Sequence, residues 1–202
     1  MQEKQKMKVL IACEYSGTVR RAFRARGHDA WSCDILPSED NSEHHFQEDV
    51  TNLLNNGWDL MIGHPPCTYL TVAGVCWLHK DPTRWDKMRD GAKFFRTLLE
   101  APIPKICIEN PVMHKYGKEI IGTSQTQVIQ PWMFGHLEQK ATCLWLKGLP
   151  PITPTKNVKA EMMKLPDRER QRLHYLPPSK DRWKERSRTF TGIAEAFASQ
   201  WG

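Results

Sequence analysis

Residues 8–27, KVLIACEYSGTVRRAFRARG, decide the fold class of this chain. The first six residues form an apolar run that is typical of a buried strand. Gly17 then allows a turn, and apolar residues recur at helical spacing from Val19 to Phe23. Gly27 follows them and is the residue type that most often ends a helix. The order of strand, glycine turn and helix predicts the start of an α/β sheet, whose first turn can bind a nucleotide-like ligand.

Apolar runs and helical patterns alternate along the rest of the chain. Further strands are expected at 29–35, 58–64 and 105–111. An amphipathic helix is expected at 83–100, and this alternation favours a mostly parallel sheet with helices on both faces. The runs at 126–130 and 142–149 predict two more strands that pair like a hairpin at the sheet edge. The last stretch, 190–201, predicts a closing helix.

The chain of 202 residues is expected to form one domain, because it is long enough for a real core but short for two domains. Its net charge is +6, and from Pro151 onward eleven Lys and Arg stand against six Asp and Glu, a net charge of +5. Between 149 and 188 the sequence is rich in Pro, Lys and Arg and has weak periodicity, which predicts an extended basic segment. Such a segment suits contact with phosphates, and a solvated basic surface is the alternative.

The sequence has no pattern typical of secretion or membrane insertion. The N-terminal residues MQEKQKMK lead directly into a predicted strand, and no apolar run approaches the roughly 18 residues of a membrane-spanning helix. The six cysteines form no CxxC pair and lie mostly within apolar, strand-like runs. We therefore expect a cytoplasmic protein with reduced thiols, in which disulfides have no functional part.

Two acidic residues follow the first turn at positions suited to nucleotide binding. Asp34 ends the second strand, roughly 20 residues after the turn, where a carboxylate can accept hydrogen bonds from both hydroxyls of a ribose. Asp49 ends a third short stretch and is suited to accept a hydrogen bond from an exocyclic amine. Helix capping or exposure on a loop is the alternative role of such acids.

Two predicted strands end in residues that can perform chemistry. In GHPPCTY, residues 63–69, each proline fixes φ at about −65° and removes a backbone donor, so the strand ends and Cys67 is presented on a stiff loop. In KICIENP, Glu109 is a carboxylate within an apolar strand, which is costly to bury unpaired. Because parallel strands end at the same edge, we expect thiol and carboxylate beside the ligand crevice. The alternatives are a Cys67 packed under the loop and a Glu109 paired with Lys or Arg.

A thiol beside a carboxylic acid suits the modification of a pyrimidine ring at carbon 5. That carbon is not nucleophilic by itself, but addition of a thiolate to carbon 6 makes an enamine whose carbon 5 can attack an electrophile. A carboxylic acid that protonates or hydrogen-bonds ring nitrogen 3 stabilises the charge that this addition creates. Because burial raises the pKa of a carboxyl group, we expect a raised pKa for Glu109.

PPC followed by IEN, with an acidic residue after the second strand and a basic segment behind, resembles the cytosine-5 DNA methyltransferases. The run QPWMFGHLEQKATCLWLKGLPP, residues 130–151, is similar to the compact phage-encoded branch of that family. The resemblance covers about residues 8–150 and the terminal helix. It implies a Rossmann-like class I S-adenosylmethionine-dependent methyltransferase fold with a seven-stranded, mostly parallel sheet. It also implies methyl transfer from S-adenosylmethionine to carbon 5 of cytosine in DNA, in a phage or bacterial protein of the cytoplasm.

The resemblance implies roles for the residues around the thiol. Cys67 would be the nucleophile toward carbon 6, and Glu109 would engage nitrogen 3 of a cytosine flipped out of the DNA. Pro65 and Pro66 would orient the thiol and contact the flipped base, and Asn110 would shape the loop. A cytosine pocket is thus implied at the ends of two neighbouring strands.

The resemblance also places S-adenosylmethionine along the first turn and the two acidic positions. Asp34 would hold its ribose and Asp49 its adenine amine, while residues 13–17 would form the turn on the methionine side. The full implied set for the cofactor is Cys13, Glu14, Tyr15, Ser16, Gly17, Asp34, Ile35, Asp49 and Pro65. No metal is implied.

The sequence departs from the family pattern at several points. The FxGxG turn reads CEYSG, with Tyr15 at the first glycine, and the PCQ and ENV motifs read PCT and ENP. The QxRxR strand reads QKAT, residues 139–142, in which Lys140 takes part of the arginine role. A separate target-recognition lobe is missing, and the basic segment 149–188 stands in its place. Sequence selectivity must then come from that segment, from a partner or a second subunit of a dimer, or be weak.

Three other functions are compatible with the sequence. His64 with Cys67 and Cys76 with His79 are two pairs of zinc-ligand type, although two prolines fill the first spacer and the pairs are close together. The missing lobe removes most of the expected contact with DNA, so a free cytidine nucleotide is an alternative substrate. A non-catalytic binding protein with the same fold is the third possibility.

Overall fold

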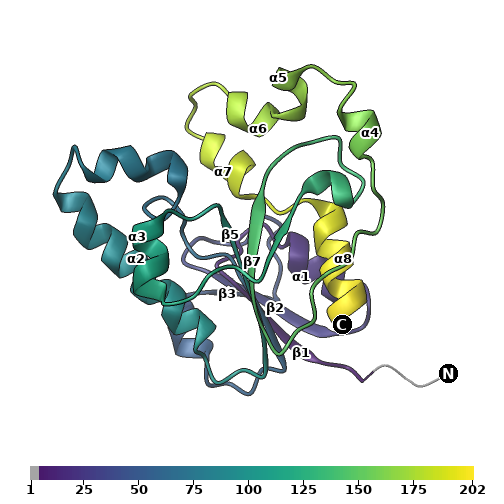
Figure 1. Cartoon of the computed structure of the whole chain (residues 1–202). Coiled ribbons are helices and arrows are strands. Elements are labelled where there is room, and N and C mark those ends of the chain that lie inside the picture. The colour runs from purple at the N-terminus through teal and green to yellow at the C-terminus, as the bar shows by residue number, and fades with distance from the viewer. Residues whose placement is uncertain (1–4) are drawn as a thin grey trace.

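A central sheet of seven strands, covered by helices on both faces, organises the protein (Figure 1). The computed structural model describes residues 5–202; the first four residues, in the stretch where no signal peptide is expected, lie outside that range. The strands are β1 (Lys8–Ala12), β2 (Asp29–Asp34), β3 (His45–Gln47), β4 (Leu60–Gly63), β5 (Lys105–Pro111), β6 (Gln127–Ile129) and β7 (Thr142–Lys147).

The order of the strands in the sheet is β3-β2-β1-β4-β5-β7-β6. The pairs among β1 to β5 are parallel, whereas β7 is antiparallel to both of its neighbours, β5 and β6. The predicted mostly parallel sheet with a closing antiparallel pair is therefore confirmed. From β1 the chain proceeds outward to β3 and then crosses to β4 on the other side, and a crevice for ligands is expected at the carboxyl ends of such strands.

Helices occupy both faces of the sheet, as Figure 1 shows. The helices α2 and α3 lie on one face, and α1 and α8 lie together on the other. The α-helices are α1 (Thr18–Arg24), α2 (Thr83–Leu99), α3 (Lys115–Ile121), α4 (Lys159–Met162), α5 (Asp167–Arg170), α6 (Arg172–Tyr175), α7 (Arg182–Ser187) and α8 (Thr191–Trp201). Three 3₁₀ helices are η1 (Val50–Leu53), η2 (Val72–Leu78) and η3 (Pro131–Met133). The helices predicted after Gly17, at 83–100 and at 190–201 are thus confirmed.

Two hydrophobic clusters, one on each face of the sheet, form the core. Buried residues of α2, such as Phe95, pack with Trp145 of β7 on one face. Phe23 of α1 and Phe197 of α8 belong to the cluster on the other face. Because every residue of β4 is buried, its continuous apolar run is that of a central strand covered on both sides.

The register between β4 and β5 brings their ends together. Gly63 pairs with Ile108, so the residues that follow, His64 and Glu109, are neighbours at the carboxyl edge. A Cβ atom at Gly63 would lie 2.8 Å from Cδ1 of Ile108, which is closer than real Cβ contacts. Glycine at position 63 therefore permits close packing against Ile108 at the end of β4, just before the two prolines.

The weak periodicity of the basic segment 149–188 predicted an extended chain, and this prediction is wrong. The segment contains the four short helices α4 to α7. Figure 1 shows these helices grouped at one end of the molecule. Helices of four to six residues are too short to display a 3.6-residue period, which explains the error. Ile152, Met162 and Leu173 are buried and anchor the segment, and Arg172 pairs with Glu138 at 3.0 Å.

Among residues 5–202, no helix is both long and apolar enough to span a membrane. All six cysteines are free thiols. Cys33, Cys107 and Cys143 are buried in strands, whereas Cys76 is exposed in η2.

Candidate active site

The turn between β1 and α1 is stabilised by Glu14, which points into the protein. Its Oε1 accepts a hydrogen bond from the Val19 N–H at 2.7 Å, and its Oε2 accepts one from the Arg20 N–H at 3.2 Å. The first turn of a helix leaves its N–H groups without intrahelical partners, so this carboxylate caps α1. Glu14 is only 5% exposed. It was predicted among the cofactor-binding residues, and its carboxylate is already engaged with the protein backbone.

Two residues of the turn adopt left-handed backbone conformations. They are Cys13, with φ of 59°, and Gly17, with φ of 67°. A Cβ atom on Gly17 would lie 2.3 Å from Nη2 of Arg20, so glycine is required there for space as well as for conformation. Tyr15, which replaces a glycine of the FxGxG pattern, has no positive φ. The turn therefore bends at its two ends rather than at Tyr15.

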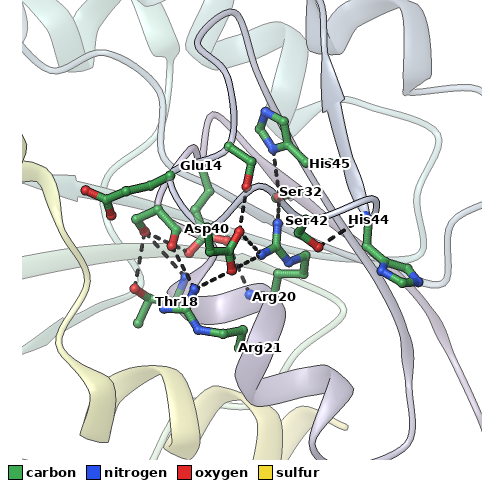
Figure 2. A network of polar contacts seen from close by, with 12 residues as sticks. Glu14, Thr18, Arg20, Arg21, Ser32, Asp40, Ser42, His44 and His45 are labelled. Atoms are coloured by element: carbon green, nitrogen blue, oxygen red, sulfur yellow. Dashed lines mark hydrogen bonds and ion pairs between the residues drawn. The ribbon is translucent and has the colours of Figure 1, made fainter.

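A buried network holds the loop after β2 against α1 (Figure 2). Arg20 is 1% exposed, and its guanidinium donates to Asp40 at 2.5 and 2.7 Å and to the Ser32 hydroxyl at 2.8 Å. Arg21 pairs with the same carboxylate at 2.6 Å. His45 Nδ1 contacts Ser32 Oγ at 2.9 Å, so β3 joins the network. These contacts fix the loop that follows Asp34 and Ile35, on the adenosine side of the predicted cofactor site.

Asp40→Asn is expected to lower the free energy of unfolding by about 3 kcal/mol. Removing one partner of a buried ion pair leaves the other charge uncompensated, and the value is at the lower end of the usual range because the Asp40 side chain is 31% exposed. Urea unfolding measures the loss. The matched control is Asp86→Asn, which breaks the exposed Asp86–Arg89 pair and is expected to cost less than about 1 kcal/mol. Equal losses in the two variants would contradict the structural role of Arg20.

The helix α7 of the basic segment packs over the first turn. The rings of Trp183 and Tyr15 are 5.6 Å apart between centroids. Arg188, just after α7, binds both carboxylate oxygens of Glu39 at 2.7 Å, and the Glu39 N–H donates to the Tyr15 carbonyl at 2.9 Å. The basic segment thus contributes to the wall of the site.

Asp34, Ile35 and Asp49 lie together at the ends of β2 and β3. The negative charges of Asp34 and Asp49 both act on the Cys13 thiol, whose pKa is raised by burial first and by these carboxylates next. Ile35 is 75% exposed, which leaves an apolar surface beside Asp34. Asp34 accepts a hydrogen bond from the Leu36 N–H at 2.9 Å, and Asp49 caps η1 through the Thr51 N–H at 2.9 Å.

The ends of β4 and β5 are tied together by Asn110. Its side-chain amide donates to the Pro65 carbonyl at 3.2 Å, and the residue is 1% exposed. Pro65 is buried whereas Pro66 is exposed. The carbonyl of Cys67 accepts hydrogen bonds from the N–H groups of Leu70 and Thr71 at 3.0 and 3.2 Å, so the thiol stands at the start of a tight turn. Asn110 therefore shapes the loop that carries Cys67.

The Cys67 thiol lies in an environment of mixed charge. Burial raises its pKa, and the nearby Glu109 carboxylate adds to this effect. The positive charges of Lys140 and Arg186 act in the opposite direction, as does the backbone of Cys67 itself. The net result is a raised pKa, so the resting form is the thiol, and formation of the thiolate depends on the two cations.

Glu109 pairs with a histidine, and not with the Lys or Arg of the alternative that the sequence left open. Its Oε2 is 3.0 Å from Nδ1 of His64, and the Thr189 hydroxyl donates to the same oxygen at 3.4 Å. Burial raises the pKa of the Glu109 carboxyl, but the hydrogen bond and charge of His64, with the charge of Lys140, outweigh it. The net pKa is lowered, so the expectation of a raised pKa is wrong: burial was foreseen, and the cationic neighbours were not.

Lys140 lies between the catalytic candidates and the basic segment. Its ammonium donates to the carbonyl of Arg186 at 2.9 Å, just at the end of α7. Its charge acts on Cys67, on Glu109 and on His64. Its ammonium is therefore near all three side chains, and its part in a pocket stays a prediction.

Two residues of the site were not predicted to act there. His64 stands directly before the two prolines, and the pattern suggested it only as a zinc ligand. The position of His64 beside Glu109 follows from the register of β4 and β5. Gly63 pairs with Ile108, so the residues that follow them are neighbours. Thr189 approaches Glu109 across 80 positions of sequence, and no local pattern could have found it.

The two pairs of zinc-ligand type do not come together as a cluster. Among residues 5–202, no group of three or more His, Cys, Asp or Glu side chains is arranged to hold a metal ion. His64 contacts Glu109, while His79 packs against the rings of Trp85 and Tyr116.

Comparisons with known proteins find similarity in the fold. No family model matches the chain, and no curated protein matches it by sequence. An E. coli prophage protein described as a DNA modification methyltransferase superimposes with a TM-score of 0.50 at 16% identity, over 80% of this chain and 56% of the other. This chain thus spans little more than half the length of that protein.

Two further solved structures give lower scores. The Entamoeba histolytica methyltransferase EhMeth has a TM-score of 0.49 at 14% identity, covering 76% of this chain and 58% of its own. The S. pombe Dnmt2 methyltransferase has a TM-score of 0.44 at 11% identity, covering 90% and 62%. With its seven-stranded, mostly parallel sheet flanked by helices, the chain has the Rossmann-like fold of the class I S-adenosylmethionine-dependent methyltransferases.

Proposed function

We propose that the protein transfers a methyl group from S-adenosylmethionine to carbon 5 of cytosine in DNA, through a covalent bond between Cys67 and carbon 6. The observation that carries the proposal is the meeting of a thiol and a carboxylate at the ends of β4 and β5. Cys67 and Glu109 interact electrostatically, and Lys140 acts on both. These groups adjoin the first turn of the fold, because the charge of Glu14 also acts on His64.

The residues at the ends of β1 and β2 fit S-adenosylmethionine. Asp34 offers a carboxylate for the ribose hydroxyls, and the exposed side chain of Ile35 offers an apolar face for adenine. Asp49 lies close enough to Cys13 for its negative charge to raise the pKa of that thiol. Its carboxylate is proposed to face the adenine amine. When bound, the cofactor supplies an electrophilic methyl group.

The residues of the chain account for the rest of the reaction. The Cys67 thiolate adds to carbon 6, and the electron pairs of the ring shift so that carbon 5 becomes nucleophilic while nitrogen 3 takes a proton from the side of Glu109. After carbon 5 has accepted the methyl group and lost its proton, Cys67 is eliminated. Pro65, Pro66 and Asn110 hold the thiol in place for both steps.

Contact with DNA is proposed for the basic segment 149–188, as in a compact phage-type enzyme in which it replaces a target-recognition lobe. Its Lys and Arg excess suits a polyanion, and Trp183 of α7 is 48% exposed beside the turn. In η2, ten positions after Cys67 in the sequence, the exposed Trp77 lies under the ammonium of Lys80 at 4.7 Å. Both α7 and η2 therefore offer an exposed aromatic ring with basic neighbours, which suits contact with DNA.

Methyl-labelled S-adenosylmethionine tests the proposal when it is offered with duplex DNA, single-stranded DNA and free cytidine nucleotides in parallel. Digestion of the DNA to nucleosides is expected to show the label in 5-methyldeoxycytidine. Label in free nucleotides alone would identify the alternative substrate, and label on the exocyclic amine of cytosine would contradict the covalent mechanism. No transfer to any of them would favour a binding protein.

Lys140→Gln is expected to shift the acid limb of the activity profile to higher pH and to lower the rate at pH 7 about tenfold. The reactive species is the thiolate, and loss of the Lys140 charge raises the pKa of Cys67 further, so less thiolate is present at any given pH. Gln can still donate to the Arg186 carbonyl. Lys140→Arg keeps the charge and is the control, with a profile expected near that of the wild type. Identical profiles for both variants would show that the charge does not act on the thiol.

A further inference from the structure

His64 lies at the end of β4, between two acidic side chains. Its backbone N–H donates to the Ala12 carbonyl at 2.9 Å, which fixes it beside the end of β1. Its Nδ1 is 3.0 Å from Oε2 of Glu109, and the side chains of the two residues are 13% and 12% exposed. The other charged groups that act on the ring are Glu14 from the turn after β1 and Lys140 before β7. The partner within direct reach is thus Glu109.

The carboxylate of Glu109 is bound on one side only. Among residues 5–202, its ion pair with His64 and its hydrogen bond from Thr189 both involve Oε2. The Oε1 atom is therefore the oxygen left to face a ring bound beside Cys67. His64 orients the carboxylate by holding the other oxygen.

The contact between the two side chains favours a proton on the His64 imidazole over one on the Glu109 carboxyl group. Burial lowers the pKa of the His64 imidazole, but the hydrogen bond and charge of Glu109, helped by Glu14, raise it above its usual value. The pKa of Glu109 is lowered by the same contact. Both shifts favour the imidazolium and the carboxylate, so Glu109 alone has no proton to give in the resting protein.

We propose that His64 is the proton reservoir of Glu109, and that its Nδ1 proton reaches nitrogen 3 of cytosine through the Glu109 carboxyl while Cys67 adds to carbon 6. This inference rests on the proposed function. His64 touches no reacting atom and acts through Glu109, so it is a positioning residue of the site.

The protons and electrons of this step balance. As the bond from sulfur to carbon 6 forms, the electrons of the C5–C6 double bond move to C4–C5 and those of N3–C4 move to nitrogen 3. The Nδ1–H bond breaks as Oε2–H forms, and the carboxyl turns about Cγ–Cδ and passes the proton to nitrogen 3. His64 is then neutral and Glu109 a carboxylate. When Cys67 is eliminated, the proton returns from nitrogen 3 to the pair.

The pH profile of methyl transfer reports on this reservoir. Activity requires one proton on the pair, so it should fall at alkaline pH as His64 loses its proton, above the usual range of histidine because its pKa is raised. Without an imidazole, only Glu109 itself can hold the proton, and the fall should occur at lower pH, where a carboxyl group titrates.

His64→Asn provides the first test, because its amide can still donate to Oε2 from about the place of Nδ1 but cannot store a proton. We expect the single-turnover rate at pH 7 to fall about 10²-fold, and the alkaline limb to move to lower pH. His44→Asn is the control, since that ring lies beside Trp31 and away from the pair. An alkaline limb in His64→Asn that coincides with that of the wild type would overturn the proposal.

A second test needs no turnover, namely nuclear magnetic resonance titration of the imidazole nitrogens in the wild type and in Glu109→Gln. The pKa of His64 should be raised in the wild type and should drop in Glu109→Gln, whereas that of His136, which burial lowers, should not move. A His64 that titrates without regard to Glu109 would overturn the proposal even in an active enzyme. A coupled titration in a protein that methylates no cytosine would instead contradict the proposed function, and with it the role of His64 in that reaction.

Discussion

Cys67→Ala is expected to abolish methyl transfer to cytosine while leaving the binding of S-adenosylmethionine nearly unchanged. Without a thiolate at carbon 6, carbon 5 of the ring is not nucleophilic, and the methyl group of alanine offers no nucleophile in place of sulfur. Apart from Pro65, the residues proposed for the cofactor end or follow β1, β2 and β3, so removing the sulfur does not disturb them. Label transfer from methyl-labelled cofactor, with calorimetry for cofactor binding, measures the two properties separately.

Cys76→Ala is the matched control for this prediction. Its thiol is exposed in η2, only nine positions along the chain from Cys67, and should be dispensable for turnover. Retained turnover in Cys67→Ala would exclude Cys67 as the nucleophile. Zinc bound at one mole per chain, and lost in both variants, would instead establish the metal site.

Glu109→Gln is expected to lower the single-turnover rate by about 10² to 10⁴, the usual range of acid and base assistance. Glutamine keeps the shape of the side chain and can still contact the ring, but it cannot pass a proton to nitrogen 3. It also removes the negative charge that favours the protonated form of His64. The variant therefore loses both the stored proton on His64 and the carboxyl group that would pass it to the ring.

Glu100→Gln is the control for charge, because Glu100 lies at the exposed end of α2 and pairs with Arg96 of the same helix at 2.8 Å. Its rate should equal that of the wild type. An unchanged rate in Glu109→Gln would mean that another group engages the ring, and lost cofactor binding would place Glu109 in a different role.

The order of elements in this fold follows from local patterns in the sequence. β1 and β4 are short continuous apolar runs, buried in the structure, and Gly17 marks the turn into α1 at a position where a side chain would collide with Arg20. Proline ends β4 as its fixed φ requires. The four short helices of the segment 149–188 were missed, because they are held by contacts with distant residues such as Glu138 and not by their own periodicity.

The candidate site was only partly foreseeable for the same reason. That Cys67 and Glu109 lie at one edge follows from the parallel sheet, and the side chain of Asn110 donates to the Pro65 carbonyl of the Cys67 loop. The ionisation of Glu109 depends on His64 and Lys140, which come from two other segments, so its direction could not be read from burial alone. The capping role of Glu14 likewise became visible only with the geometry of α1.

Covalent trapping tests the central claim most directly. The protein is incubated with S-adenosylmethionine and DNA that contains 5-fluorocytosine, and the intact mass of the chain is measured before peptide mapping. Fluorine cannot leave carbon 5 as a proton does, so Cys67 cannot be eliminated once the methyl group has been transferred. The proposed mechanism predicts an adduct of methylated DNA at Cys67. Binding of the DNA with no adduct, or an adduct at another residue, would contradict it.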